Sequence, residues 1–132
     1  MEISPVIANK KILIVEDANS LRLTLISSLR NLGFESLIEA TDGQQALKIM
    51  KTKKINIIIS DWIMPNMSGL ELFNTIKLDD NLKNIPFILL TGDDQKESVT
   101  QAIQAGIQNY IVKPFNPTKL FEKVVELLEK QS

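Results

Sequence analysis

Short apolar runs that stop at polar residues constrain the fold of this chain more than any other feature of its sequence. There are four of them, each with three or four aliphatic or aromatic residues, at positions 12–15, 55–59, 87–90 and 110–112. A weaker strand is predicted at positions 36–40. Because the runs are apolar at neighbouring positions, both faces of each strand must be buried, as in a parallel sheet covered by helices on both sides.

Amphipathic segments with recognisable ends separate these runs. A leucine stripe at positions 21, 25, 29 and 32 ends at Gly33, a residue typical of helix termination. Further helix starts are marked by caps at Asp42, Ser68 and Asp94, each three residues before Gln or Glu, and by Asn116 before Pro117. The alternation predicts an α/β fold, a (βα)5 doubly wound sandwich around a five-stranded parallel sheet.

Polar side chains follow the predicted strands at the point where each strand ends. They are Glu16, Asp17, Asp61, Thr91 and Lys113. Ligands of such sheets collect at the carboxyl ends of the strands, so we expect these groups to converge. The three carboxylates would repel one another without a cation, and Mg²⁺ takes carboxylate, water and phosphate oxygens. With a lysine and a hydroxyl added, the set suits a phosphoryl group, whereas any one member alone is more often a solvated loop residue or a cap.

Two absences narrow the chemistry further. The chain has no cysteine and no histidine, which excludes disulfides, thiolate chemistry, a Ser-His-Asp triad and a phosphohistidine of its own. A metal must therefore be held by oxygen ligands, as Mg²⁺ or Ca²⁺ is. The formal net charge of -1 argues against a direct nucleic-acid platform.

The organisation expected from the sequence is one domain at residues 10–132 after an N-terminal extension at residues 1–9. Residues 1–8 lack the features of a signal peptide, and no apolar run is long enough to span or insert into a membrane. The cytoplasm is the expected location.

Four segments of the sequence resemble the response-regulator receiver family of two-component signalling systems. They are residues 14–17 (IVED), 60–69 (SDWIMPNMSG), 89–92 (LLTG) and 110–115 (YIVKPF). The resemblance extends over about residues 10–130, and the single-domain chemotaxis members are the most similar. It implies a flavodoxin-like sheet with strand order 2-1-3-4-5.

The resemblance also assigns roles to individual residues. Asp61 matches the phosphoacceptor, Glu16 and Asp17 match the acidic pair that binds Mg²⁺, and the backbone carbonyl of Ile63 matches a further metal ligand. Thr91 and Lys113 match the hydroxyl and the lysine that contact the phosphoryl group. Thr91 also matches the switch residue that acts with Tyr110, and Lys113-Pro114 matches a cis peptide bond.

Three positions depart from the family pattern. Glu16 stands where aspartate is frequent, Ile63 where the chemotaxis members have asparagine, and Gly92 where alanine is usual. None of these changes removes an essential group, but each bears on metal geometry or reaction rate.

The implied mechanism is transfer of a phosphoryl group from a partner histidine kinase to Asp61, which then changes protein contacts. Candidates for the partner face are Lys96, Val99, Ile103, Tyr110 and Lys123, for which ordinary surface or core positions are an equal alternative. The expected target is a flagellar motor switch protein, and a phosphatase is a further candidate partner. The alternative is a phosphorelay or other non-chemotaxis receiver, including one cut from a larger regulator.

An aspartate-nucleophile phosphohydrolase is a more remote alternative. Such enzymes need a second aspartate two positions after the nucleophile, and Ile63 occupies that place. The chain is therefore expected not to be an enzyme, but a phosphoacceptor that assists its own phosphorylation and dephosphorylation. The glycines form neither a G-x-G-x-x-G motif nor a P-loop, which argues against a nucleotide carrier.

Overall fold

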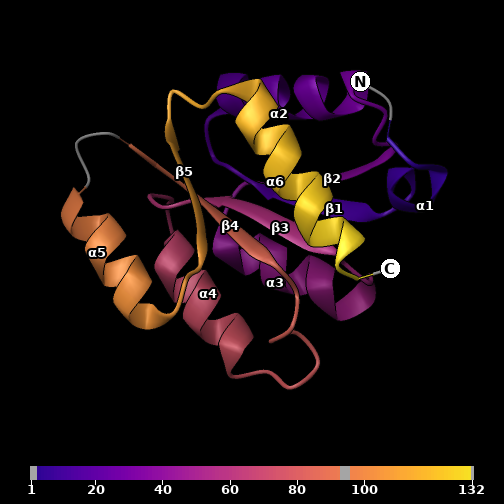
Figure 1. Cartoon of the computed structure of the whole chain (residues 1–132). Coiled ribbons are helices and arrows are strands. Elements are labelled where there is room, and N and C mark those ends of the chain that lie inside the picture. Colours follow the sequence, from indigo (N-terminus) through magenta and orange to yellow (C-terminus); the bar gives the residue numbers. More distant parts are fainter. Residues whose placement is uncertain (1–2, 93–95, 132) are drawn as a thin grey trace.

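The described part of the chain folds into one parallel sheet with helices on both faces (Figure 1). The structure is a computed structural model that describes residues 3–92 and 96–131, with the backbone alone at 96–98. The strands are β1 (Lys11–Val15), β2 (Ser36–Ala40), β3 (Ile57–Asp61), β4 (Phe87–Gly92) and β5 (Asn109–Lys113). Their order is β2-β1-β3-β4-β5, which confirms the flavodoxin-like topology.

Two groups of helices cover the two faces of the sheet (Figure 1). One face packs against α1 (Pro5–Ala8), α2 (Asn19–Asn31) and α6 (Pro117–Glu129). The other packs against α3 (Gly43–Thr52), α4 (Gly69–Lys77) and α5 (Lys96–Ala105). Alternate residues of each central strand enter opposite clusters, for example Ile14 and Ile12 on the first face and Leu13 and Val15 on the second.

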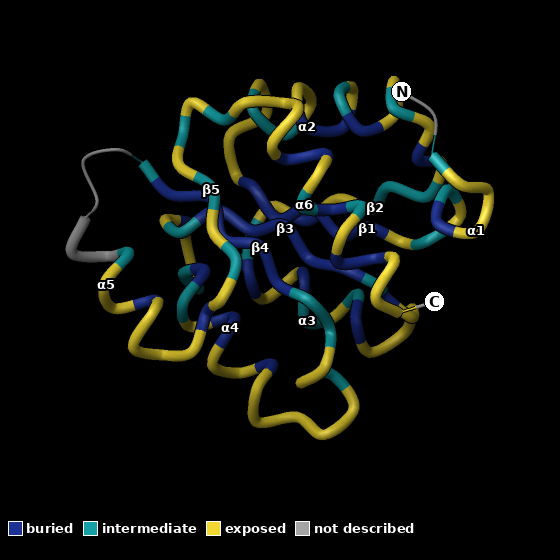
Figure 2. The backbone as a smooth tube through the Cα atoms, in the orientation of Figure 1, coloured by how far each residue is buried: buried dark blue, intermediate teal, exposed yellow. Residues whose placement is uncertain are grey.

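Burial follows the predicted pattern along the central strands (Figure 2). All five residues of β3 are buried, while β5 alternates between half-buried and exposed positions at the edge of the sheet. The edge position explains why Tyr110 and Val112 remain on the surface although the sequence pattern is apolar there.

The helix ends agree with the predicted caps. Asp42 accepts a hydrogen bond from the N–H of Gln45, Ser68 forms a full capping box with Glu71, and Asn116 caps the helix that begins at Pro117. Gly33 follows α2 with φ 108°, a conformation that favours glycine. The predicted cap at Asp94 lies outside the described residues.

The first helix lies outside the five predicted repeats. Ser4 caps α1 by accepting from the N–H of Val6, and Pro5 occupies its first turn. Ile7 is 2% exposed and packs into the core on the α2–α6 face. The N–H of Glu35 donates to the Ala8 carbonyl at 3.1 Å, which fixes this segment to the start of β2.

No helix in residues 3–92 and 96–131 has the length and apolar character needed to cross a membrane.

Candidate functional site

Strand register brings Glu16 and Asp61 side by side. Val15 pairs with Ser60, so the residue after each lies at the same level of the sheet edge. Carboxylate oxygens of Glu16, Asp17 and Asp61 all lie within 4.8 Å of one another. Glu16 and Asp61 are buried, whereas Asp17 is exposed. The structure thus brings together the three acidic residues that the sequence singled out.

Glu16 is an unusual carboxylate because it is buried and one of its two oxygens has no hydrogen-bond partner among the described residues. Its Oε2 accepts from the N–H of Ala18 at 3.1 Å, whereas its buried Oε1 has no hydrogen-bond partner in the described part of the chain. Burial raises the pKa of Glu16 to about 7; the Ala18 N–H opposes this shift and the charge of Asp61 adds to it. A buried oxygen without a partner beside two other carboxylates would be stabilised by a bound cation or by a proton.

Lys113 reaches the cluster from the far side of β4. Its Nζ lies 2.9 Å from Asp61 Oδ1, and the same oxygen accepts the N–H of Trp62 at 2.9 Å. The Asp61 side chain is only 10% exposed, so the carboxylate end of this ion pair is shielded from solvent, whereas the Lys113 side chain is 28% exposed. Lys113 is followed by a cis bond to Pro114, as the resemblance implied.

The donor set fits Mg²⁺. Three carboxylates against one ammonium leave an excess of two negative charges when Glu16 is ionised, which one divalent ion would balance. All candidate ligands are oxygens, the donor type that Mg²⁺ prefers. The acidic cluster of Glu16, Asp17 and Asp61 could therefore hold such an ion, with Asp17 at its open, solvent-facing side.

The chain turns back sharply after Asp61. The N–H of Gly69 donates to the Trp62 carbonyl at 2.8 Å, and a Cβ at Gly69 would overlap the backbone oxygen of Asp61. Only glycine fits this close approach without moving the backbone. Ile63 lies in the loop so formed, two residues after Asp61, and is 60% exposed rather than buried in the core.

Thr91 and Tyr110 occupy neighbouring strands on one face of the sheet. Thr91 pairs with Val112, and Leu89 pairs with Tyr110. Residues paired in a parallel sheet share a face, as do residues two apart, so both side chains lie on the side of α5. Thr91 is completely buried, whereas Tyr110 is 42% exposed.

The candidate partner face is partly described. Ile103 and Tyr110 are exposed, Val99 is half-buried, and Lys123 is half-buried in an ion pair with Glu126. Lys96 begins α5, but its side chain lies outside the described part of the structure.

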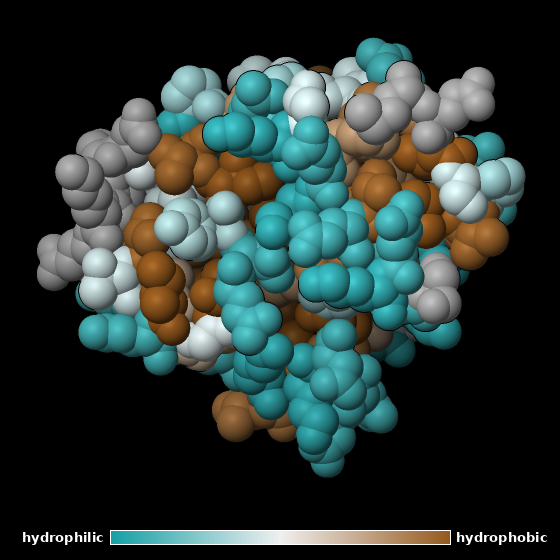
Figure 3. Space-filling view, viewed as in Figure 1, coloured by the Kyte–Doolittle hydropathy of each residue, from teal (hydrophilic) through white to brown (hydrophobic). Residues whose placement is uncertain are grey.

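A groove lies at one side of this face. It measures about 470 Å³ between β5 and α6, and its lining includes Tyr110, Val112, Pro114 and Lys123. Figure 3 shows hydrophobic residues exposed here, beside the polar surface of α6.

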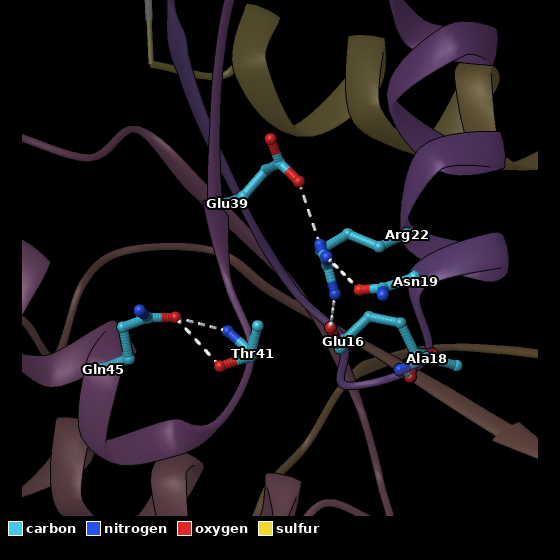
Figure 4. A network of polar contacts seen from close by, with 7 residues as sticks. All are labelled: Glu16, Ala18, Asn19, Arg22, Glu39, Thr41 and Gln45. Atoms are coloured by element: carbon cyan, nitrogen blue, oxygen red, sulfur yellow. Dashed lines mark hydrogen bonds and ion pairs between the residues drawn. The ribbon is translucent and has the colours of Figure 1, made fainter.

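Sequence reasoning missed Arg22, whose side chain holds the loop after β1 (Figure 4). Its Nη1 donates to the backbone carbonyl of Glu16 at 2.8 Å, and its Nε pairs with Glu39 at 2.9 Å. Its remaining nitrogen donates to Asn19. The sequence carried a weak signal, because Arg22 is the only basic residue among the first turns of α2.

Sequence reasoning also missed Asn66, which has φ 68° in the loop after β3. Its amide donates to Asp42 Oδ2 at 2.9 Å. The hydrogen bonds from Gln45 N–H and from Asn66 hold the pKa of Asp42 below its usual value. An asparagine followed by Met-Ser-Gly signals a turn, but not the partner of its side chain.

Comparison with known proteins places the chain in two-component signalling. The chain belongs to the response regulator receiver domain family, whose model matches residues 12–125. It is 39% identical over 122 residues to chemotaxis protein CheY-3 of Vibrio cholerae, covering 92% of this chain and 94% of that protein. It is 36% identical to chemotaxis protein CheY of Pseudomonas aeruginosa, covering 91% and 97%. Both are similar proteins over nearly their full length.

Solved structures agree. The chemotaxis response regulator CheY4 of Vibrio cholerae superposes with a TM-score of 0.81 at 30% identity, covering 91% of this chain and 99% of that one. The receiver domain of a Pseudomonas aeruginosa sensor histidine kinase, solved with a magnesium ion coordinated in its active site cleft, gives a TM-score of 0.83 at 26% identity, covering 92% and 98%.

Proposed function

We propose that this receiver domain accepts a phosphoryl group on Asp61 from the phosphohistidine of a partner histidine kinase. The observation that carries the proposal is the ion pair between Lys113 and Asp61 beside the carboxylates of Glu16 and Asp17. Receiver domains are signalling proteins rather than classical enzymes, and the chemistry here is a single transfer to the protein itself.

Asp61 is the nucleophile in this proposal. One of its carboxylate oxygens forms a bond to phosphorus while the bond between phosphorus and the imidazole nitrogen breaks, with that electron pair remaining on the nitrogen. Lys113 turns from Asp61 Oδ1 to an oxygen of the incoming group, so its charge stays at the site throughout. Glu16, Asp17, Asp61 and the Ile63 carbonyl would hold Mg²⁺, which would neutralise charge on the phosphoryl oxygens when bound.

Thr91 and Tyr110 form the switch in this proposal. Thr91 contacts the phosphoryl group, and its shift makes room for Tyr110 on the same face of the sheet. The movement changes the surface formed by Val99, Ile103, Tyr110 and Lys123, to which Lys96 is assigned on sequence alone.

Chemotaxis signalling in the cytoplasm, with a flagellar motor switch protein as target and a phosphatase as a further partner, is the pathway we propose. The similarity to chemotaxis proteins over nearly the whole chain supports it. We assign residues 10–132 to the receiver domain and residues 1–9 to an N-terminal extension. A phosphorelay receiver would share the same site and differ in its output partner.

Labelling of the acceptor tests the proposal directly. The protein is incubated with a small phosphodonor and Mg²⁺, and intact mass is measured for wild type and Asp61→Asn. One added phosphoryl group on wild type and none on the variant is the expected result, and equal labelling of both would remove Asp61 from the mechanism.

The metal site has its own optical test. Trp62 is the only tryptophan and follows Asp61, so its fluorescence should respond to Mg²⁺. Asp17→Asn should weaken that response strongly, because one of three clustered carboxylates loses its charge. An unchanged titration would argue against the proposed ligands.

A further inference from the structure

The segment at residues 39–43, which comprises the end of β2, the turn and the first residue of α3, contacts both loops that carry the candidate metal ligands. It is called the turn below. One loop follows β1 and contains Glu16 and Asp17, and the other follows β3 and contains Ile63. β2 lies at the edge of the sheet, with β1 between it and β3. The turn therefore reaches past β1 to the second loop, a contact that strand pairing alone does not require.

The first contact is made through Arg22 (Figure 4). Its guanidinium is anchored by Glu39 of β2 and in turn holds the backbone carbonyl of Glu16. The N–H of Glu16 donates to the Ala40 carbonyl at 3.0 Å. The backbone N–H of Glu16 is thus held directly by β2, and its backbone carbonyl is held by β2 through Arg22.

The second contact is made through Asn66. Its amide donates to Asp42 Oδ2, and its φ of 68° is maintained in the same loop that presents Ile63. Next to it, Met67 lies so close to Gly43 that a Cβ there would be 2.8 Å from the Met67 sulfur. The hydrogen bond between Asn66 and Asp42, called the latch below, and the apolar contact between Met67 and Gly43 therefore hold the loop against the start of α3.

The turn itself is anchored to α3. Asp42 Oδ1 accepts from the N–H of Gln45 at 2.8 Å. The hydroxyl of Thr41 donates to Gln45 Oε1 at 3.2 Å, as Figure 4 shows. Asp42 thus uses one carboxylate oxygen for the helix and the other for Asn66. The first turn of α3 therefore supports the loop that follows β3 and contains Ile63 and Asn66.

We infer that this turn is a brace that sets the spacing of the two ligand loops before a metal binds, with Asp42 and Asn66 as positioning residues. The inference rests on the proposed function, because it assumes that the Ile63 carbonyl and the three carboxylates receive Mg²⁺. Ligands that are already in place lose less conformational freedom on binding. Releasing the latch leaves every ligand present but lets the loop with Ile63 move, which lowers affinity without removing chemistry.

Two substitutions open the latch with little other change. Asn66→Gly removes the amide and keeps a residue that adopts positive φ readily. Asp42→Ser keeps a good helix cap but lacks the second oxygen for Asn66. Asp42→Asn serves as the conservative variant, since its amide oxygen can cap α3 while its NH₂ donates to a flipped Asn66 amide. Asn81→Gly, in an exposed loop that contains none of the candidate ligands, is the matched control.

Mg²⁺ affinity is measured by Trp62 fluorescence, and backbone hydrogen exchange of residues 63–67 is followed without metal. Asn66→Gly and Asp42→Ser should each weaken Mg²⁺ binding about three- to tenfold, the scale of one ordinary hydrogen bond at the protein surface. The double variant should be no weaker than either single one, because both remove the same contact. Exchange should accelerate, and phosphorylation at saturating Mg²⁺ should stay close to wild type. Asp42→Asn and Asn81→Gly should bind Mg²⁺ as wild type does.

Three outcomes would overturn the brace in distinguishable ways. If Asp17→Asn loses Mg²⁺ binding while Asn66→Gly keeps wild-type affinity, the metal site stands and the brace is wrong. If wild type itself shows no Mg²⁺ binding, the proposed metal site fails and the brace fails with it. An affinity loss fully explained by a smaller folded fraction, measured by circular dichroism, would also refute positioning.

Discussion

Lys113 Nζ lies 2.9 Å from Asp61 Oδ1, an ion pair between the ends of two strands that are not neighbours, since β4 separates β5 from β3. A positive charge therefore occupies the candidate acceptor before any phosphoryl group arrives. The lysine both prepares the site for an anion and competes with a cation for the same carboxylate.

Replacing Lys113 should separate these two effects. Lys113→Met should bind Mg²⁺ more tightly, by about 1 kcal/mol, because a competing charge is lost from Asp61. Labelling by a small phosphodonor should slow by about tenfold or more, because no ammonium meets the phosphoryl oxygens. Fluorescence titration and timed intact-mass measurement give the two quantities. Faster labelling would assign Lys113 a purely structural role.

Glu16 makes the stability of the metal-free protein depend on pH. Its pKa of about 7 lies above the ordinary 4.5, so the folded state holds this proton more tightly than the unfolded state. Stability from Glu16 is therefore present at low pH and is lost as pH rises from about 4.5 through about 7. Glu16→Gln should raise the melting temperature at pH 8 and change it little at pH 4.5. Mg²⁺ should stabilise wild type more than the variant at pH 8, and an equal effect on both would remove Glu16 from the metal site.

Ile63 should tune the lifetime of the phosphorylated state. Its side chain is exposed, two residues after Asp61. We expect it to lie near the path of a water that attacks the phosphoryl group, where an apolar branched group offers that water no hydrogen bond. Ile63→Asn can orient such a water, and one hydrogen bond of about 1 kcal/mol corresponds to roughly fivefold faster decay. The measurement is loss of label after donor removal at fixed Mg²⁺. Unchanged decay with weaker Mg²⁺ binding would mean that the side chain serves the metal site instead.

Thr91 should be needed for the conformational response to phosphorylation but not for phosphorylation itself. Thr91→Ala leaves Asp61 and the acidic residues intact, so labelling should persist while the gain in partner binding on phosphorylation largely disappears. Thr91→Ser keeps the hydroxyl at this fully buried position and should retain most of that gain. Partner binding with and without phosphodonor is compared for both. A full gain in the alanine variant would uncouple Thr91 from Tyr110.

The sheet and the acidic cluster were predictable because both follow from local patterns. Runs such as 87–90 must be buried on both faces, and parallel strands bring their carboxyl ends to one edge. Residues at or just after the carboxyl ends of the strands, including Glu16 and Asp61, therefore lie close together. The caps at Asp42, Ser68 and Asn116 were predictable for the same reason, since each acts within one helical turn.

Side-chain contacts between segments far apart in the sequence were not predictable in this way. The pairing of Asn66 with Asp42 joins residues 24 apart in sequence, and that of Arg22 with Glu39 joins residues 17 apart. Neither has a periodic signal, because each depends on how two separate segments approach after the sheet has formed. The burial of Ile7 was missed because a four-residue helix is too short to show amphipathic spacing.

That buried isoleucine limits how the receiver can be used as a module. Ile7 fills the α2–α6 side of the core, and Ser4 and Pro5 begin the helix that holds it there. A chimaeric regulator joined at residue 10 would leave a hole in that core, and loss of such a buried side chain costs about 2–5 kcal/mol. Fusion junctions and tags for grafting this domain onto other proteins therefore belong before Ser4.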